Sequence, residues 1–458
     1  MATELGLEGA LLDDASLAAV FSGNVVPEGA DPIALAYAGH QFGHFVPQLG
    51  DGRAILLGEL VDRSGTRRDV QFKGSGRTPY SRGGDGRAAL GPVLREYLVS
   101  EAMHALGIPA TRSLAAVATG EVVFRERDLP GAIVTRVAAS HVRVGTFEYF
   151  AARRDREAVQ ILADYVIDRH YPHLKGAERP YLELLRTVCG RQAALVASWM
   201  HVGFIHGVMN TDNTAVSGET IDFGPCAFMD AYDPATVFSS IDAMGRYAYA
   251  NQPLAAQWNL ARFAETLLAL IDADVNRAAE AAGAEIDAFS ERFALQWLIG
   301  MRHKFGLLTP LDGDLELVRA WLDAMHRNGC DYTLTFRRLC DLADSDADAR
   351  AADAELRSSF SQPGEYETWA ADWRSRLARE PDSGKQRARS MRRVNPAFIP
   401  RNHRVEQIIA AAIERADFAP FEELLKVLSR PYDAQPGFEA YAAPPRAAER
   451  VLRTFCGT

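Results

Sequence analysis

Cysteine, positive net charge and long apolar runs are all scarce in this chain of 458 residues. It has five cysteines, and none forms the C-x-x-C pair of a zinc or thioredoxin-like site. So sparse a set is typical of a reducing compartment rather than of a disulfide framework. No apolar run approaches the roughly 18–20 residues that a membrane-spanning helix needs.

The charge balance limits the function further. The 50 Lys and Arg residues stand against 60 Asp and Glu, a net charge of −10, which argues against a dedicated nucleic-acid-binding protein. A local basic groove for a phosphorylated ligand stays compatible with it. The N-terminus lacks a basic region followed by an apolar core, so we expect no signal peptide and a cytoplasmic protein.

Length and pattern together predict two parts. At about 150 residues per domain, two or three domains or lobes are expected. The pattern of residues 46–140 predicts a small β-rich lobe with one inserted helix. An N-terminal extension over residues 1–45 precedes it. The expected elements are strands at 54–61, 69–73, 112–118, 121–126 and 131–138 and a helix at 92–106.

Residues 141–458 are predicted to be mainly helical, so the fold class is α+β. A short hairpin turning at Ser217-Gly218 is expected within residues 213–221. Residues 374–404 carry ten Lys and Arg against two acids. They could bind an acidic partner, but a solvated helix and linker is the simpler interpretation. The expected helices are 147–154, 156–170, 181–204, 255–282 and 287–305.

Lys73 and Glu96 form the first candidate pair. Lys73 ends a predicted strand, and Glu96 lies 23 residues later inside a predicted helix. Kinase folds present a cation to nucleotide phosphates through a strand lysine paired with a helix glutamate. Taken alone, the two residues are more simply interpreted as an ordinary ion pair.

A candidate metal site lies at Asp222, which opens an Asp-Phe-Gly triplet of the kind that kinases use to hold metal. Nine residues earlier stands Asn213, and Asn plus Asp is the usual pair of kinase magnesium ligands. Carboxylate oxygens are hard ligands that suit Mg²⁺. A chance triplet is the alternative, because the chain has 36 glycines.

The segment from His206 to Asn213 keeps the histidine-to-asparagine spacing of the protein-kinase catalytic loop. Val208 stands where that loop has its catalytic aspartate, and valine cannot accept a hydroxyl proton. The chain therefore either lacks this chemistry or places its base elsewhere. Asp212 is the nearest carboxylate.

The tetrapeptide Gly-Asp-Gly-Arg occurs twice, at residues 50–53 and 84–87. Glycines allow the backbone to approach an anion closely, successive N–H groups can form an anion nest, and the arginines add bidentate contacts. The alternative is a plain hairpin turn, for which Asp-Gly is a strong signal.

Four further residues and a cysteine carry weaker signals. Arg136 and Arg143 would ordinarily be surface arginines. His40 and His44 have a spacing that suits helix metal ligands, but no third ligand lies nearby, so we expect no metal there. Cys226 is interpreted as a small buried hydrophobic residue rather than a nucleophile.

These motifs belong to longer segments that together resemble the SelO (YdiU) family, a group of kinase-like proteins. The resemblance runs from about residue 30 to the C-terminus. The segments that carry it are 37–43, 48–59, 78–87, 100–104, 206–213, 245–247 and 395–402.

The resemblance implies a kinase-like, two-lobed α+β fold, with a small N-lobe at 46–140 and a helical C-lobe at 141–458. It implies a protein adenylyltransferase that transfers AMP from ATP to Ser, Thr or Tyr hydroxyls of proteins. ATP would be bound in an inverted orientation, with the γ-phosphate buried. Mg²⁺ or Mn²⁺ is the implied metal, ATP and protein substrates are the implied partners, and neither nucleic acid nor a membrane is expected.

The same resemblance implies roles for individual residues. Lys73 would meet phosphate with Glu96 as its helix partner, and Asp212 would accept the proton of the acceptor hydroxyl. Asn213 and Asp222 would hold the metal. The other nucleotide-binding residues that it implies are Gly50, Gly52, Arg53, Asp85, Gly86, Arg136 and Arg143.

The chain departs from the family pattern at its end. The tail Cys456-Gly457-Thr458 is a cysteine variant of a family tail that in some members pairs with an activation-loop cysteine. Residues 227–250 hold no cysteine, and only Cys226 is close in sequence, which argues against redox regulation by that route. The short segment before Tyr37 shows no transit peptide, which favours a bacterial cytoplasmic member.

Two other functions stay open on the sequence. One is a conventional phosphotransferase, against which Val208 argues. The other is a catalytically inactive, nucleotide-sensing scaffold. The retained Lys73, Asn213 and Asp222 argue against that function, because a pure scaffold has no need of metal ligands.

Overall fold

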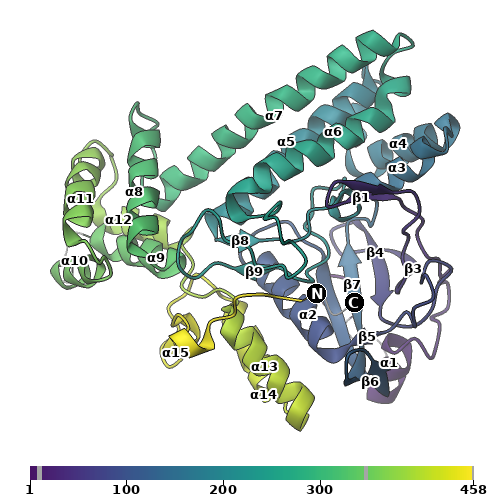
Figure 1. Ribbon diagram of the computed structural model, residues 1–458, viewed down its shortest axis with the longest axis horizontal. Helices are drawn as coiled ribbons and strands as arrows, with labels where there is room; N and C mark the ends of the chain where they lie inside the picture. Colours follow the sequence, from purple (N-terminus) through teal and green to yellow (C-terminus); the bar gives the residue numbers. More distant parts are fainter. Residues whose placement is uncertain (8–12, 345–348, 456–458) are drawn as a thin grey trace.

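A five-stranded antiparallel sheet and a larger set of helices make up the protein, an α+β arrangement (Figure 1). The computed structural model describes residues 1–7, 13–344 and 349–455. Strand β7 is central, since it pairs with β4, β5 and β6, while β3 pairs with β4. The strands are β3 (Ala54–Val61), β4 (Arg67–Lys73), β5 (Ala88–Ala89), β6 (Arg112–Phe124) and β7 (Asp128–Ala138).

The sequence pattern located these strands well. Strands β3 and β4 confirm the predicted pair at 54–61 and 69–73. The two runs predicted at 112–118 and 121–126 are one long strand, β6, whose pairing with β7 shifts register between Ala118 and Val122. An irregularity within one strand therefore produced the apparent gap between two.

Helix α2 (Leu90–Ala105) confirms the predicted helix and packs on strands β6 and β7. Its other neighbours come from the far end of the sequence, because α13 (Asn402–Arg415) and α14 (Ala419–Leu428) share one apolar cluster with it. The close contact is visible at Gly91, where an added Cβ would lie 3.0 Å from Ile409. Arg95 of α2 also forms an ion pair with Glu406 of α13.

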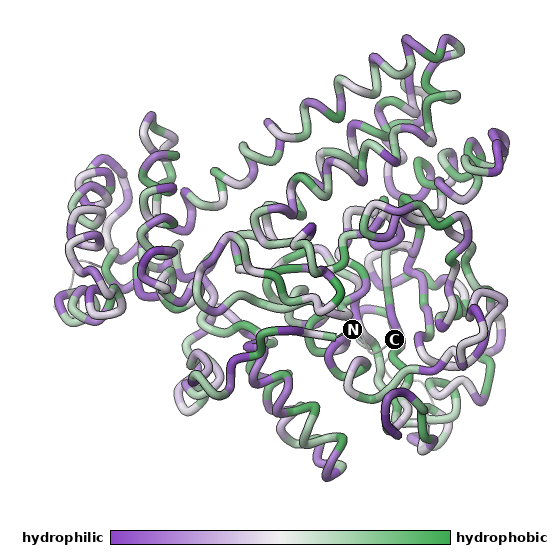
Figure 2. Tube along the Cα trace, viewed as in Figure 1, coloured by the Kyte–Doolittle hydropathy of each residue, from purple (hydrophilic) through white to green (hydrophobic). Residues whose placement is uncertain are grey.

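The larger core belongs to the helical part, where α5, α6 and α7 run beside one another above the sheet in Figure 1. Hydrophobic residues recur along these helices among polar ones (Figure 2). The helices of this part are α3 (Val144–Ala152), α4 (Arg156–His170), α5 (Pro180–His201), α6 (Gln252–Ile271) and α7 (Val275–Lys304).

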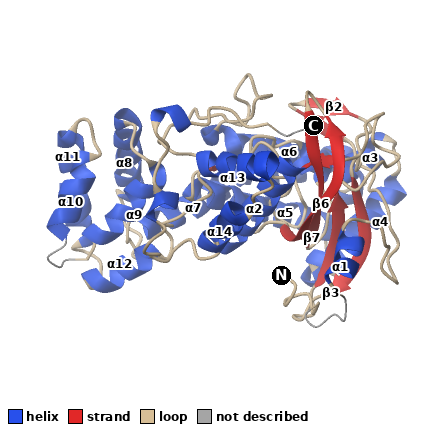
Figure 3. Ribbon diagram, turned by 90° about the horizontal axis from the view of Figure 1, so that it is seen from below, coloured by secondary structure: helices blue, strands red, loops and turns tan. Residues whose placement is uncertain are grey.

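Helices α8 to α12 form the end of the molecule opposite the sheet (Figure 3). Two short strand pairs, β1 with β2 and β8 with β9, lie outside the main sheet. None of the helices in the described part of the chain is long and apolar enough to span a bilayer. The remaining bounds are α1 (Asp14–Phe21), β1 (Gly39–Gln41), β2 (His44–Val46), β8 (Phe204–Ile205), β9 (Ala227–Phe228), α8 (Asp314–Asn328), α9 (Tyr332–Leu342), α10 (Ala349–Ser358), α11 (Pro363–Leu377), α12 (Gly384–Arg392) and α15 (Glu439–Ala442).

The predicted boundary between helices 255–282 and 287–305 is wrong. The break lies at residues 272–274, between α6 and α7. The side chain of Asp274 accepts hydrogen bonds from the backbone N–H groups of Asn276 and Arg277, and so caps the start of α7. A polar cap at a helix start satisfies otherwise unpaired N–H donors. The start of α7 is therefore set by the Asp274 cap rather than by the spacing of apolar residues.

The predicted hairpin at 213–221 is also wrong, although its turn is real. Gly218 has a positive φ of 81°. The two ends of the turn do not pair with each other, because Ala215 bridges Arg143 and Thr220 bridges Ala110. The segment thus joins two other parts of the molecule.

The basic segment 374–404 is partly neutralised by neighbouring acids. Arg374 pairs with Asp353, Arg376 with Asp314 and Glu380, and Arg392 with Asp341. These pairs favour the interpretation as ordinary helix surface over a site for an acidic partner.

Arg401 offers a test of the packing around α13. Its buried guanidinium lies 2.7 Å from a carboxylate oxygen of Asp230 and 2.7 Å from one of Asp331. Replacing Arg401 with Met leaves two carboxylates without their cation, so we expect the free energy of unfolding to fall by about 3–5 kcal/mol. Urea denaturation measures this. The control is Arg415→Met, because that side chain is 61% exposed and should change stability by less than about 0.5 kcal/mol; equal losses in the two variants would contradict the prediction.

Candidate active site

Four charged side chains meet between the sheet and the helical part. Lys73 Nζ lies 2.7 Å from Glu96 Oε2 and also bonds Asp222 Oδ1. Arg136 bonds Glu96 through Nε and Asp222 Oδ1 through Nη2, the latter at 2.7 Å. Each cation therefore contacts both carboxylates, and the structure confirms the ion pair between Lys73 and Glu96.

The charges in this cluster fix its protonation. Burial would raise the pKa of Glu96, but the nearby Arg136 and Lys73 outweigh it and lower that pKa below its usual range. Burial would also raise the pKa of Asp222, but the positive charges of Lys73, the stronger influence, and of Arg136 hold it well below its usual range. Both carboxyl groups are therefore ionised at neutral pH.

Strand alternation explains how the cluster forms. Gln71 pairs with Arg136 across β4 and β7, and Lys73, two residues further, points to the same face of the sheet. Glu96 reaches this face from α2, which packs on it. Asp222 has a positive φ of 69°, an uncommon conformation for a residue other than glycine.

A second polar group lies beside the first. Asp51 Oδ2 accepts hydrogen bonds from Gln71 Nε2 at 3.0 Å and from the Leu35 backbone at 3.2 Å. Buried Arg143 donates from Nη1 to the backbone oxygen of Asp212 at 3.0 Å. Its Nη2 has no hydrogen-bond partner among the described residues, and Asp51 Oδ1 lies 4.0 Å away.

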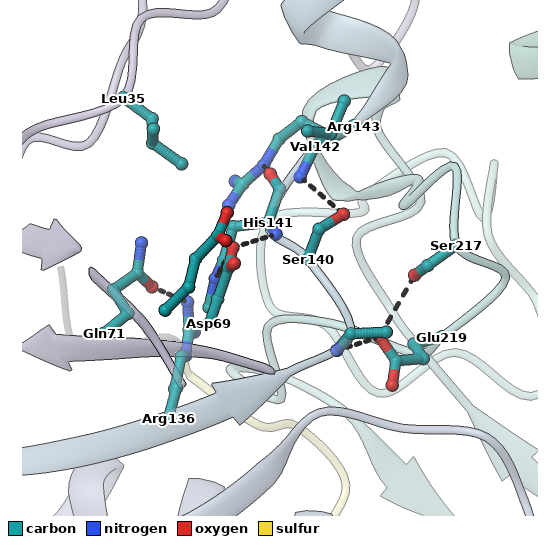
Figure 4. Close-up of polar contacts among 12 residues, drawn as sticks. Leu35, Asp69, Gln71, Arg136, Ser140, His141, Val142, Arg143, Ser217 and Glu219 are labelled. Atoms are coloured by element: carbon teal, nitrogen blue, oxygen red, sulfur yellow. Dashed lines mark hydrogen bonds and ion pairs between the residues drawn. The ribbon is translucent and has the colours of Figure 1, made fainter. Parts of the chain in front are cut away.

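The segment that joins β7 to α3 is fixed by its own polar contacts (Figure 4). Asp69 Oδ2 accepts from the backbone N–H of His141 at 2.8 Å and lies 3.1 Å from its Nδ1. Glu219 accepts from the backbone N–H of Ala139 and from the hydroxyl of Ser217. Burial raises the pKa of Glu219 to about 7. These contacts fix the path of the backbone between Arg136 and Arg143.

The loop that follows β8 carries the candidate base. His206 Nε2 lies 2.9 Å from the Ile221 backbone oxygen, which ties this loop to Asp222. Val208 is buried, and its apolar side chain provides no carboxylate at that position. Asp212 is buried too, and burial, only partly offset by the Arg143 charge, raises the pKa of its carboxyl to about 6. Its Oδ1 has no hydrogen-bond partner in the described part of the chain.

The two Gly-Asp-Gly-Arg segments pack differently. An added Cβ at Gly50 would lie 2.2 Å from Tyr80 Cγ, and one at Gly52 would lie 2.9 Å from the Tyr80 backbone oxygen, so the first segment lies tightly against the loop at Tyr80. In the second segment Asp85 is held by Arg125 at 2.8 Å. Gly86, with a positive φ of 69°, packs against the backbone of Gly76.

The oxygen donors fit a magnesium ion bound together with phosphate. Asn213 donates from Nδ2 to the Val208 backbone oxygen at 3.0 Å, which leaves its Oδ1 as the atom for a cation. Asp222 is ionised and partly exposed. No cluster of three or more His, Cys, Asp or Glu side chains that could hold a metal occurs in the described residues, but Mg²⁺ needs only one or two protein ligands when phosphates and waters complete its shell.

The structure brings most of the sequence-predicted residues together. Lys73, Glu96, Arg136 and Asp222 form one cluster, and Arg53 lies near enough that its charge also lowers the pKa of Asp222. Asp85 and Gly86 lie in a separate loop with partners of their own. Cys226 is buried, with its thiol 3.5 Å from the Phe223 oxygen, and burial raises its pKa to about 12, while Cys456 lies outside the described residues.

Sequence reasoning missed Asp51, Gln71 and Asp69 as parts of this site. Counting by two from Lys73 along the strand would have found Gln71 and Asp69, because alternate residues share a face. Asp51 stood between two glycines that were already candidates, and its contact with Gln71 needs the folded pairing of β3 with β4.

Comparison with known proteins places the chain in the family that the sequence motifs resemble. A family model described as "Protein adenylyltransferase SelO" matches residues 1–429, so the similarity begins earlier than residue 30. The "Protein nucleotidyltransferase YdiU" of Rhizobium johnstonii is 66% identical over 459 residues, covering all of this chain and 91% of that protein. Proteins of the same name from Rhizobium meliloti and Bradyrhizobium sp. strain BTAi1 are 64% and 63% identical, covering all of this chain and 92% of each.

The buried cluster predicts a large difference between two glutamates. Glu96→Gln leaves Lys73 and Arg136 with Asp222 as their remaining carboxylate, so we expect the free energy of unfolding to fall by about 3–5 kcal/mol. Glu183→Gln removes an exposed ion pair with Arg186 and should cost less than about 1 kcal/mol. Urea unfolding of both variants measures the difference, and a loss below 1 kcal/mol for Glu96→Gln would show that the cluster contributes little.

Proposed function

The chain belongs to the SelO family of protein adenylyltransferases, and we propose that it transfers AMP from ATP to Ser, Thr or Tyr hydroxyls of other proteins. The family membership supports nucleotidyl transfer with ATP as a substrate. The proposal goes beyond the family membership in three respects: the acceptor residues, the orientation of ATP and the roles of the site residues.

We propose a kinase-like architecture with two lobes, in which residues 46–140 form the N-lobe and residues 141–458 the C-lobe, after an extension over residues 1–45. The ion pair of Lys73 with Glu96 supports this, since strand β4 and helix α2 present the two residues as kinases do. The position of Asp222 next to both of them is also as expected for a metal-binding aspartate.

The observation that carries the proposal is the buried, unpartnered Nη2 of Arg143. A buried guanidinium nitrogen without a hydrogen bond is costly unless a ligand satisfies it. Arg143 and Arg136 are both almost fully buried, so an anion that reaches them must lie deep in the site. This supports an inverted ATP whose terminal phosphates point inward and whose α-phosphate faces the acceptor. Arg53, Gly50 and Gly52 would contact the nucleotide from one loop, and Asp85 and Gly86 from the other.

In the proposed reaction, the acceptor hydroxyl oxygen attacks the α-phosphorus and forms a new P–O bond. The bond from that phosphorus to the bridging oxygen breaks, and pyrophosphate leaves. Asp212 accepts the hydroxyl proton, since it supplies the carboxylate of this loop. Lys73, Arg136 and Arg143 stabilise the charge on the leaving pyrophosphate. Asn213 and Asp222 would hold Mg²⁺, which supplies charge neutralisation to the phosphates.

Labelled ATP tests the reaction. The protein is incubated with Mg²⁺, a cell lysate as the source of acceptors, and ATP labelled on either the α- or the γ-phosphate. We expect covalent label in protein from the α-position alone, because AMP transfer discards the β- and γ-phosphates. Label from the γ-position alone would establish a phosphotransferase instead. Asp222→Ala is the control that should abolish transfer.

Two aspartates should separate chemistry from binding. Asp212→Asn removes the proposed base, so we expect kcat to fall by about 10²–10⁴-fold while Mg-ATP still raises the thermal midpoint of the variant. Asp222→Ala should lose both activity and the Mg²⁺-dependent part of that thermal shift, because a ligand stabilises the folded state by an amount that grows with the logarithm of its affinity. Near-wild-type transfer by Asp212→Asn would rule it out as the base.

A further inference from the structure

Three residues from separate elements form a closed circuit of hydrogen bonds beside Asp212. Thr211 accepts from the backbone N–H of His40 at 2.7 Å and donates its hydroxyl to Glu148 Oε2 at 2.5 Å. The other oxygen of Glu148 bonds His40 Nδ1. Each of the three residues thus contacts the other two, His40 through its ring to Glu148 and through its backbone N–H to Thr211. Thr211 is the direct neighbour of Asp212 in the chain.

The circuit joins the strand pair β1–β2, helix α3 and the turn that carries the candidate base. His40 lies on β1, Glu148 on α3, and Thr211 opens the 3₁₀ turn Thr211–Asn213. Glu148 is buried, and burial raises the pKa of its carboxyl, although its bonds to Thr211 and His40 oppose the shift. A buried carboxyl group holds its partners in one geometry, because losing either bond leaves it unsatisfied.

Two glycines let the three elements approach this closely. An added Cβ at Gly39 would lie 2.6 Å from Asp212 Oδ1. One at Gly145 of α3 would lie 2.3 Å from the Ala38 backbone oxygen and 3.2 Å from Asp212 Cα. The strand pair also supplies Gln41, whose Nε2 lies 3.4 Å from Asp212 Oδ2. Asp212 is therefore enclosed by the two elements that the circuit ties to its turn.

The ring of His40 is held on its other side by aromatic packing. Its centroid lies 4.9 Å from that of Phe45 and 5.1 Å from that of Trp258. The spacing of His40 and His44 suits metal ligands on a helix, although no metal was expected there. The two residues lie on paired strands rather than on a helix, and Nδ1 of His40 bonds Glu148. The contacts of His40 are those of an orienting residue rather than of a metal ligand.

We propose that His40, Glu148 and Thr211 act as positioning residues that hold the Asp212 carboxylate in line with the acceptor hydroxyl. This inference rests on the proposed function, because it takes Asp212 as the base. In this proposal the three side chains act through Asp212 rather than on ATP or the acceptor. Loss of their bonds lets the turn and the strand pair shift apart, and a misplacement of about 1 Å can lower a rate by about 100-fold.

The test compares two substitutions at one position. Thr211→Val keeps the shape and removes the hydroxyl, whereas Thr211→Ser keeps the hydroxyl. We expect kcat for AMP transfer to fall about 10- to 100-fold in Thr211→Val and in Glu148→Gln, with KM for ATP and the Mg-ATP thermal shift within about twofold of wild type. Thr211→Ser should stay within about threefold of wild-type kcat. His44→Ala, an exposed change in the same strand pair, is the matched control and should leave kcat unchanged.

A double variant separates positioning from general damage to the fold. Because the circuit acts through Asp212, Thr211→Val should cause no further loss of the residual rate in an Asp212→Asn background. Additive losses, or a fall in Thr211→Ser as large as in Thr211→Val, would overturn the inference. So would a raised KM for ATP with an unchanged kcat.

Hydrogen exchange keeps this inference separate from the proposed function. Absence of α-label in wild-type assays would count against AMP transfer itself. The circuit is then judged by amide exchange, which in Thr211→Val should accelerate in both segments 38–46 and 209–214 while strand β4 stays unchanged. Unchanged exchange in those two segments would show that the circuit does not hold them together.

Discussion

The candidate site depends on the balance of charge among Lys73, Arg136, Glu96 and Asp222. Each of these groups is costly to bury alone, and removing one leaves its partners uncompensated. The four residues come from β4, β7, α2 and the turn after Ile221. Their mutual contacts therefore fix the sheet, its covering helix and the helical part in one arrangement, and Arg143 and Asp212 take their places relative to it.

Much of this site was predictable because local pattern and motif agreed. The strand that ends at Lys73 and the helix that carries Glu96 were both predicted from the spacing of apolar residues. Asp222 was predicted from the Asp-Phe-Gly triplet that it opens. Strands β3 and β4 follow from an apolar run, a turn and a second run, which are signals over fewer than 25 residues. The pairing of Lys73 with Glu96 could then be anticipated from the chemistry of kinases.

The rest could not be predicted, since it depends on contacts between residues far apart in the sequence. Thr211 lies 171 residues from His40 and 63 from Glu148, so no local spacing links them. Ala215 pairs with Arg143 and Thr220 pairs with Ala110, so the two ends of the expected hairpin pair with other segments instead of with each other. The break between α6 and α7 is set by Asp274, whose capping role outweighs the apolar spacing that continues on both sides.

The packing of α13 and α14 against α2 has a consequence for how the protein is made. Helix α2 leaves the ribosome about 300 residues before the helices that complete its apolar cluster, which at about 5–20 residues per second is a delay of roughly 15–60 s. During that interval the sheet and α2 exist with one apolar face uncovered. Exposed apolar surface of this kind favours aggregation of a nascent chain, and a polypeptide released early lacks the outer support of the helix that carries Glu96.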